Sequence, residues 1–106
     1  MNPAYSDQLL KERIQFALDN NITHEELADW CYRYIIDVYH NDYYHIATDG
    51  RESYPLSKQA TKVVNDIDSQ WGLYLVNTYS PDVLQKLDLA TVRLPRKWLE
   101  EWLQSF

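Results

Sequence analysis

The chain has 106 residues, a length typical of one domain, and its 10 basic and 16 acidic residues give a formal net charge of −6. A hydrophobic content of 45% excludes an intrinsically disordered acidic tail. One cysteine excludes a disulfide framework and a thiolate zinc cluster, so we expect no metal, no cofactor and a reducing, cytoplasmic compartment. No apolar run approaches the roughly 20 residues that span a bilayer, and acidic residues precede the first apolar stretch, so we expect no signal peptide and no membrane partner.

The negative charge is concentrated in one part of the chain. Acidic and basic residues cancel within residues 1–18 and within residues 53–106, so the whole −6 lies in residues 19–52. All three histidines (His24, His40 and His45) and five of the nine tyrosines fall in the same segment. Acidic side chains and tyrosines therefore coincide along the sequence.

The first expected helix covers residues 6–19, with Ser6 as its N-cap. Its apolar residues recur at helical spacing along one face: Leu10, Ile14, Ala17 and Leu18. Asn20 and Asn21 follow, and asparagine tolerates the left-handed conformation that is common just after a helix.

The second expected helix covers residues 24–39 and has the clearest start signal. Thr23 and Glu26 form the sequence pattern of a capping box. Asp29–Arg33 and Arg33–Asp37 are i, i+4 pairs on the outer face. The inner face carries an apolar stripe: Leu27, Cys31, Tyr34, Ile35 and Val38.

Residues 40–55 have no clear periodicity and contain turn signals at Asp49-Gly50 and Pro55, so we expect a long loop there. Connections longer than about 12 residues are uncommon in compact domains and are often functional.

Ser57 is the expected cap of a third helix that ends near Gly72. Residues 73–76 either prolong this helix or form an isolated strand, and the absence of an evident partner strand favours the helix. Ser80-Pro81 opens a short helix over 81–88, and Pro95 starts the last one. The sequence thus predicts an all-α fold, a single compact bundle of four to five helices in one domain spanning 1–106.

Motifs for catalysis or ligand binding are weak. His40 or His45 with Asp42 or Asp49 could bind a metal, but the histidine spacing does not align two ligands on one helical turn, and solvated loop histidines are the simpler interpretation. Cys31 lies on the apolar stripe and is expected to be a packed small hydrophobe rather than a nucleophile. With two glycines and no phosphate-loop motif, we expect no enzymatic activity.

Residues 21–30 superficially match the first helix of a DNA-binding helix-turn-helix. No short turn with a recognition helix follows, and the segment is strongly acidic, so phosphate would be repelled and no nucleic-acid partner is expected.

Two interpretations of the acidic, tyrosine-rich segment stay open. It is either an ordinary solvated face or an interface for a basic protein partner, because tyrosine is enriched at interfaces and clustered carboxylates accelerate association with a cation. Protonation of the three histidines would reduce the local charge from −6 to −3 and slow such association between pH 7.5 and 5.5. The candidate contact residues are Asp37, Tyr39, His40, Asp42, Tyr43, Tyr44, Asp49 and Glu52.

In its size, its capped second helix and its acidic region with Tyr43-Tyr44, the chain resembles the small acidic helical immunity proteins that bacteria pair with secreted toxins, as in colicin and contact-dependent-inhibition systems. The resemblance covers residues 22–50 and implies a non-enzymatic inhibitor that neutralises a toxin domain. The alternative is a structural or adaptor protein that self-associates through Trp98, Trp102 and Phe106; the sequence leaves the oligomeric state open.

Overall fold

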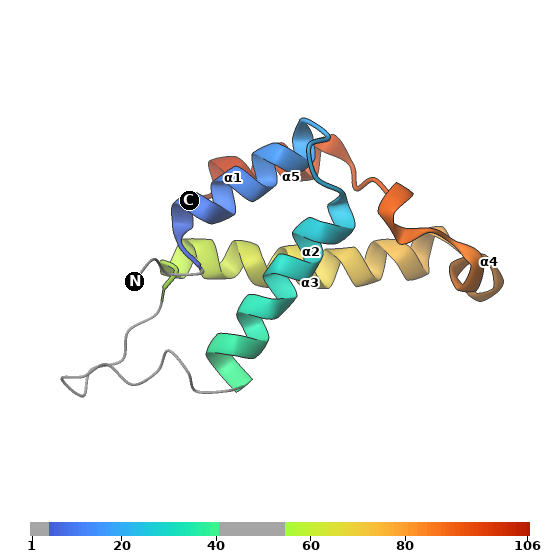
Figure 1. Cartoon of the computed structure of the whole chain (residues 1–106), viewed down its shortest axis with the longest axis horizontal. Helices are drawn as coiled ribbons and strands as arrows, with labels where there is room; N and C mark the ends of the chain where they lie inside the picture. The colour runs from blue at the N-terminus through green and yellow to red at the C-terminus, as the bar shows by residue number, and fades with distance from the viewer. Residues whose placement is uncertain (1–4, 41–54) are drawn as a thin grey trace.

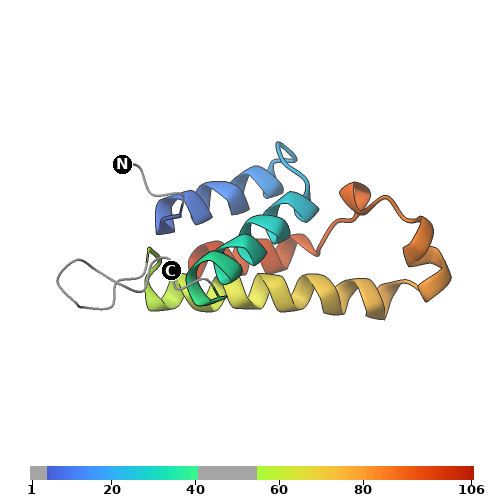
Figure 2. The same cartoon turned by 60° about the horizontal axis from the view of Figure 1, so that its bottom comes forward.

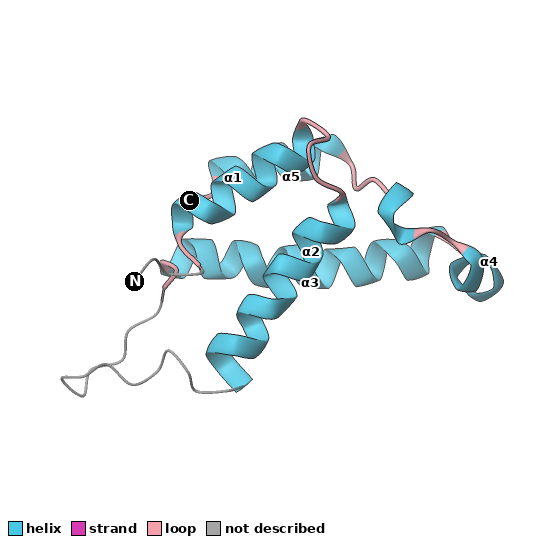
Figure 3. Cartoon of the chain, viewed as in Figure 1, coloured by secondary structure: helices cyan, strands magenta, loops and turns pink. Residues whose placement is uncertain are grey.

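The computed structural model describes residues 5–40 and 55–106, with the side chains of Tyr39 and His40 excepted. These residues form helices and no strand (Figure 3), which confirms the all-α prediction. The loop predicted at 40–55 lies, apart from its two ends, outside the described residues. The elements in chain order are α1 (Asp7–Leu18), α2 (His24–Ile35), the π-helical turn η1 (Ile36–His40), α3 (Lys58–Thr78), α4 (Pro81–Lys86), the 3-10 turn η2 (Leu89–Thr91) and α5 (Arg96–Gln104).

Side-chain caps start the first four α-helices where the sequence places them. The hydroxyls of Ser6, Ser57 and Ser80 each accept a hydrogen bond from the backbone N–H three residues later. The capping box of Thr23 and Glu26 is complete, because each side chain accepts from the other residue's backbone N–H. Such caps satisfy backbone donors that have no partner inside the helix.

Three helix ends differ from the prediction, and one of them is that α4 ends at Lys86 rather than at residue 88. The regular α2 ends at Ile35 and the chain continues as a π-helical turn, whereas the periodicity predicted one α-helix to residue 39. The helix α3 does not stop near Gly72 but runs to Thr78, which confirms the favoured expectation that residues 73–76 prolong this helix. A glycine costs a helix only about 1 kcal/mol relative to alanine, and beyond it the ring of Tyr74 packs edge-on against Trp98 of α5 at 5.9 Å.

The helices pack as two pairs. In Figures 1 and 2, α1 runs beside α5, and α2 crosses α3 near the middle of the long α3. The last part of α3 continues past α2, and α4 lies at its far end, away from the other helices (Figures 1 and 2). A reversal of the chain after α1 places α2 across α3, and Asn20 makes it with a positive φ of 63°.

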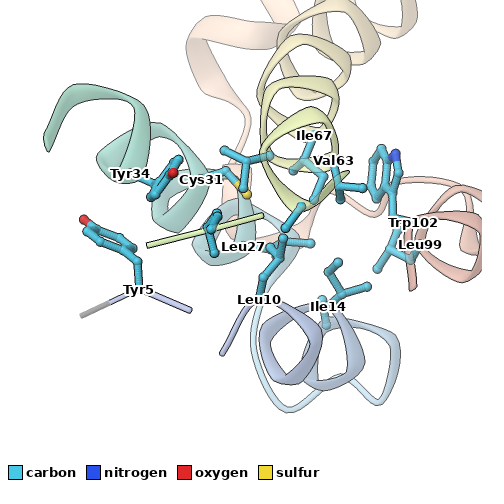
Figure 4. Close-up of a cluster of buried hydrophobic side chains, with 14 of the residues drawn as sticks. Tyr5, Leu10, Ile14, Leu27, Cys31, Tyr34, Val63, Ile67, Leu99 and Trp102 are labelled. Atoms are coloured by element: carbon cyan, nitrogen blue, oxygen red, sulfur yellow. The ribbon is translucent and has the colours of Figure 1, made fainter. Parts of the chain in front are cut away.

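The core lies where the four longer helices meet (Figure 4). The predicted stripes of α1 and α2 are buried there, except that Ile35 is only half-buried. Trp102 Nε1–H of α5 donates a hydrogen bond to Asp66 Oδ2 of α3 at 2.7 Å. Tyr5, which precedes α1, packs edge-on against Trp30 and Tyr34 of α2 at centroid distances of 5.2 Å.

Candidate partner-binding surface

The outer face of α2 carries acidic side chains, whereas its inner face packs into the core. Leu27, Cys31 and Tyr34 are fully buried. Residues 25, 29 and 32 stand on the opposite side at i, i+4 and i+7, and they are Glu25, Asp29 and Tyr32. Tyr32 is 52% exposed.

Where this face meets α3, the side chains of both helices surround a surface hollow of about 260 Å³. Asp68 and Trp71 of α3 contribute a carboxylate and a half-buried indole ring. We call the lining of this hollow the acidic aromatic surface; it consists of Glu25, Ala28, Asp29, Tyr32, Asp68 and Trp71.

Glu25 and Asp29 also line a second hollow, of about 490 Å³, on the side of α2 that faces α1. Arg13 and Arg33 stand among its acidic residues, so this hollow is of mixed charge. The carboxylates of Glu25 and Asp29 thus form a ridge between a hollow of mixed charge and an acidic hollow.

The electrostatics of the ridge are only partly balanced. The Arg33 guanidinium donates from Nε to Asp29 Oδ2 at 2.7 Å, and this hydrogen bond raises the pKa of Arg33. Both side chains are more than half exposed, so the pair contributes little to stability. Within residues 5–38 and 55–106, Glu25 and Asp68 have no ion-pair partner although both are half-buried. Partial burial removes some of the water around these two carboxylates, and a cation placed between them would compensate for that loss.

Of the contact residues predicted from sequence, the structure describes the side chain of one. Asp37 lies in η1, half-buried, and its Oδ2 accepts a 2.5 Å hydrogen bond from the Tyr5 hydroxyl. The backbones of Tyr39 and His40 belong to η1. The other predicted contacts lie outside the described residues: Asp42, Tyr43, Tyr44, Asp49 and Glu52.

The prediction that three histidines titrate together on the acidic surface is wrong for His24. This side chain is 5% exposed and its Nε2 lies 3.2 Å from the carbonyl oxygen of Ala17. Burial is the main reason why its pKa is lowered. His24 therefore belongs to the junction of α1 and α2, and it adds no charge to the outer face near neutral pH.

The C-terminal aromatic residues also pack against the core. Trp102 is 6% exposed, and Trp98 and Phe106 pack against the core as half-buried rings. The Lys11 ammonium lies 5.2 Å from the centroid of the Phe106 ring. Self-association through these three residues stays a prediction, since Trp98 and Phe106 remain partly exposed.

The structure also bears on the predicted nucleophile and metal ligands. Cys31 is fully buried, and burial raises the pKa of its thiol well above the usual range, as expected for a packed hydrophobe. Among the described residues, no three His, Cys, Asp or Glu side chains gather as metal ligands, and no helix has the length and apolarity needed to cross a membrane.

Sequence reasoning missed the acidic aromatic surface itself. The spacing of Glu25, Asp29 and Tyr32 opposite the apolar stripe was a usable signal. No sequence signal marked Asp68 and Trp71, because only the crossing of α2 over α3 brings them to the hollow that Glu25, Asp29 and Tyr32 line. No family model matches the chain, and no curated protein or solved structure matches it.

Proposed function

We propose that this chain is a non-catalytic binding protein that holds a basic protein partner against the acidic aromatic surface. One observation carries the proposal: a single hollow is lined by the carboxylates of Glu25, Asp29 and Asp68 and by the aromatic rings of Tyr32 and Trp71. Carboxylates attract a cationic side chain, and aromatic faces add a cation–π contribution.

An arginine of the partner fits this chemistry best. Its planar guanidinium pairs bidentately with carboxylates and stacks on aromatic rings, whereas a lysine ammonium interacts as a point charge. Neither Glu25 nor Asp68 is in an ion pair with another described residue. The carboxylates of Glu25, Asp29 and Asp68 would steer a basic partner toward this side.

We further propose that the partner is a bacterial toxin domain that the chain neutralises. This part of the proposal depends on the resemblance of residues 22–50 to acidic helical immunity proteins. Inhibition then requires only that the bound chain cover the toxin's substrate site, and no group of the chain takes part in a reaction.

The surface is tested by titrating the chain with a short arginine-rich peptide while amide and indole NMR signals are followed. We expect shifts to be confined to α2 and the facing part of α3, to include the Trp71 indole N–H, and to weaken as salt increases. A lysine peptide of the same charge should bind more weakly. The absence of saturable shifts at millimolar peptide would contradict the proposal.

Matched charge reversals locate the site. Asp68→Lys should reduce peptide affinity at least tenfold, because it places a cation in the hollow. Asp82→Lys changes the net charge equally at an exposed position of α4, and it should have a small effect. Equal losses in both variants would indicate a response to net charge alone and would contradict a localised site.

The toxin part is tested by co-expressing the chain with a toxin domain encoded beside its gene and measuring cell survival. Protection that Asp68→Lys abolishes and Asp82→Lys preserves is expected. Survival that is no better with the chain than without it would contradict this part.

A further inference from the structure

A small hollow in this chain of net charge −6 is lined by basic and neutral side chains. It lies where the end of α1 meets the start of α5 (Figure 1), and its volume is about 210 Å³. None of the described residues that line it is acidic. We call it the arginine hollow; its lining includes Leu18, Asn20, His24, Arg93, Leu94 and Arg96.

Neutral oxygen atoms hold both guanidinium groups at the hollow. Arg93 donates from Nη1 to Oδ1 of Asn20, and Arg96 donates from Nη1 to the carbonyl oxygen of Leu18 at 3.4 Å. These acceptors orient the two side chains without neutralising their charge. A guanidinium has five N–H donors, so most of them stay available for a ligand.

The positive charge of the arginine hollow is little compensated. Arg93 is in no ion pair with another described residue. Arg96 Nε lies 3.8 Å from Oε2 of Glu100, and both side chains are more than half exposed, so this pair is weak. Burial is the main cause of the lowered pKa of His24, and the charge of Arg93 adds to it. An anion in the hollow would therefore meet two guanidinium cations.

We propose that the arginine hollow binds a phosphate group, either as inorganic phosphate or as the phosphate of a small monoester. The planar guanidinium pairs bidentately with phosphate oxygens. Two guanidinium groups also balance the nearly two negative charges that a phosphate monoester carries near neutral pH, whereas a carboxylate carries one. The volume of about 210 Å³ lies below the roughly 300–1,000 Å³ of pockets for drug-sized ligands, so the phosphate group itself fills the hollow. This site is independent of the acidic aromatic surface, which attracts charge of the opposite sign.

The test is an NMR titration of the full chain with sodium phosphate at pH 7.5, with sodium chloride holding the ionic strength constant at 150 mM. At that ionic strength, charges more than about 8 Å away are largely screened, so the acidic segment opposes binding little. We expect saturable shifts of the Leu94 amide, the Arg93 Nε–H and the His24 ring, with a dissociation constant of about 0.1–10 mM. Sodium acetate should bind at least fivefold more weakly. Shifts that do not saturate by 50 mM phosphate, or equal binding of acetate, would overturn the proposal.

The same titration with methyl phosphate distinguishes the two sources of the phosphate group. Tighter binding of methyl phosphate than of inorganic phosphate would support a monoester as the ligand. Tighter binding of inorganic phosphate would support the free ion.

Three substitutions that each remove one positive charge locate the site. Arg93→Gln and Arg96→Gln should each weaken phosphate binding at least fivefold, because each removes one of the two cations of the hollow. Lys86→Gln removes a charge at an exposed position of α4, and it should leave the affinity nearly unchanged. Circular dichroism checks that the variants fold. Unchanged binding in both arginine variants, or equal losses in all three variants, would overturn the proposal.

Discussion

The backbone N–H of Leu94 donates a 2.8 Å hydrogen bond to Nδ1 of His24, which lies 70 residues earlier in the chain. Because Nδ1 accepts, the ring proton is assigned to Nε2, which then donates to the carbonyl oxygen of Ala17. A neutral imidazole thus joins the end of α1, the start of α2 and the segment that leads into α5. All three partners are buried, so no water replaces a lost contact at low cost.

This relationship predicts that acid destabilises the fold. Burial, with Arg93 nearby, lowers the pKa of His24 in the folded chain, whereas the unfolded histidine titrates near 6.5. The unfolded state therefore binds more protons below that pH. The stabilisation is complete above about pH 6.5 and is lost as the pH falls toward the lowered folded value, by at most about 1.4 kcal/mol per pH unit.

Urea unfolding at pH 7.5, 6.5 and 5.5 measures this loss. His24→Leu is expected to lower the free energy of unfolding by about 1–3 kcal/mol at pH 7.5, because leucine offers no acceptor to the buried Leu94 N–H. The variant should also lose less stability than the unmodified chain between pH 7.5 and 5.5. Parallel pH profiles for the two proteins would show that His24 is not the responsible group.

Asp37 and Asp29 lie eight residues apart on the same helical segment and are predicted to differ in importance for stability. Asp37→Ala removes the acceptor of the Tyr5 hydroxyl and should cost about 1–2 kcal/mol, since the bond is partly buried and its acceptor is charged. Asp29→Ala removes an exposed ion pair and should change the urea midpoint little. Similar shifts for both variants would contradict a structural role for Asp37.

Gly72→Ala is predicted to stabilise the monomer by about 0.5–1 kcal/mol. The added methyl group meets no atom of the chain, and alanine loses less backbone entropy in a helix than glycine. Thermal unfolding of the two proteins under the same conditions measures the effect. A loss of stability would mean that the helix is distorted at this position.

The Cys31 thiol is predicted to be inert in the folded chain. It is fully buried, and burial raises its pKa, so a thiolate is scarce and a reagent has no access. A disulfide reagent at pH 8 should modify the chain only at the rate of unfolding, and at once in concentrated urea. As a control, Ser69→Cys places a thiol on the exposed side of α3, and this second thiol should react rapidly in the folded protein.

Local chemistry was enough to predict much of the fold. Ser6, Ser57, Ser80 and the pair of Thr23 and Glu26 mark helix starts in the sequence, because a cap depends on residues only three positions apart. Periodicity likewise predicted the buried faces of α1 and α2, since apolar residues at helical spacing must turn to one side.

Tertiary packing decided the rest, because it brings together residues that are distant in sequence. His24 has the sequence context of a surface histidine, and only the hydrogen bond from Leu94 places it inside. Asp68 and Trp71 join Glu25 and Asp29 through the crossing of α2 over α3, which no local pattern specifies. Half of residues 72–91 are apolar, yet none of them is buried, and this was visible only in the folded structure.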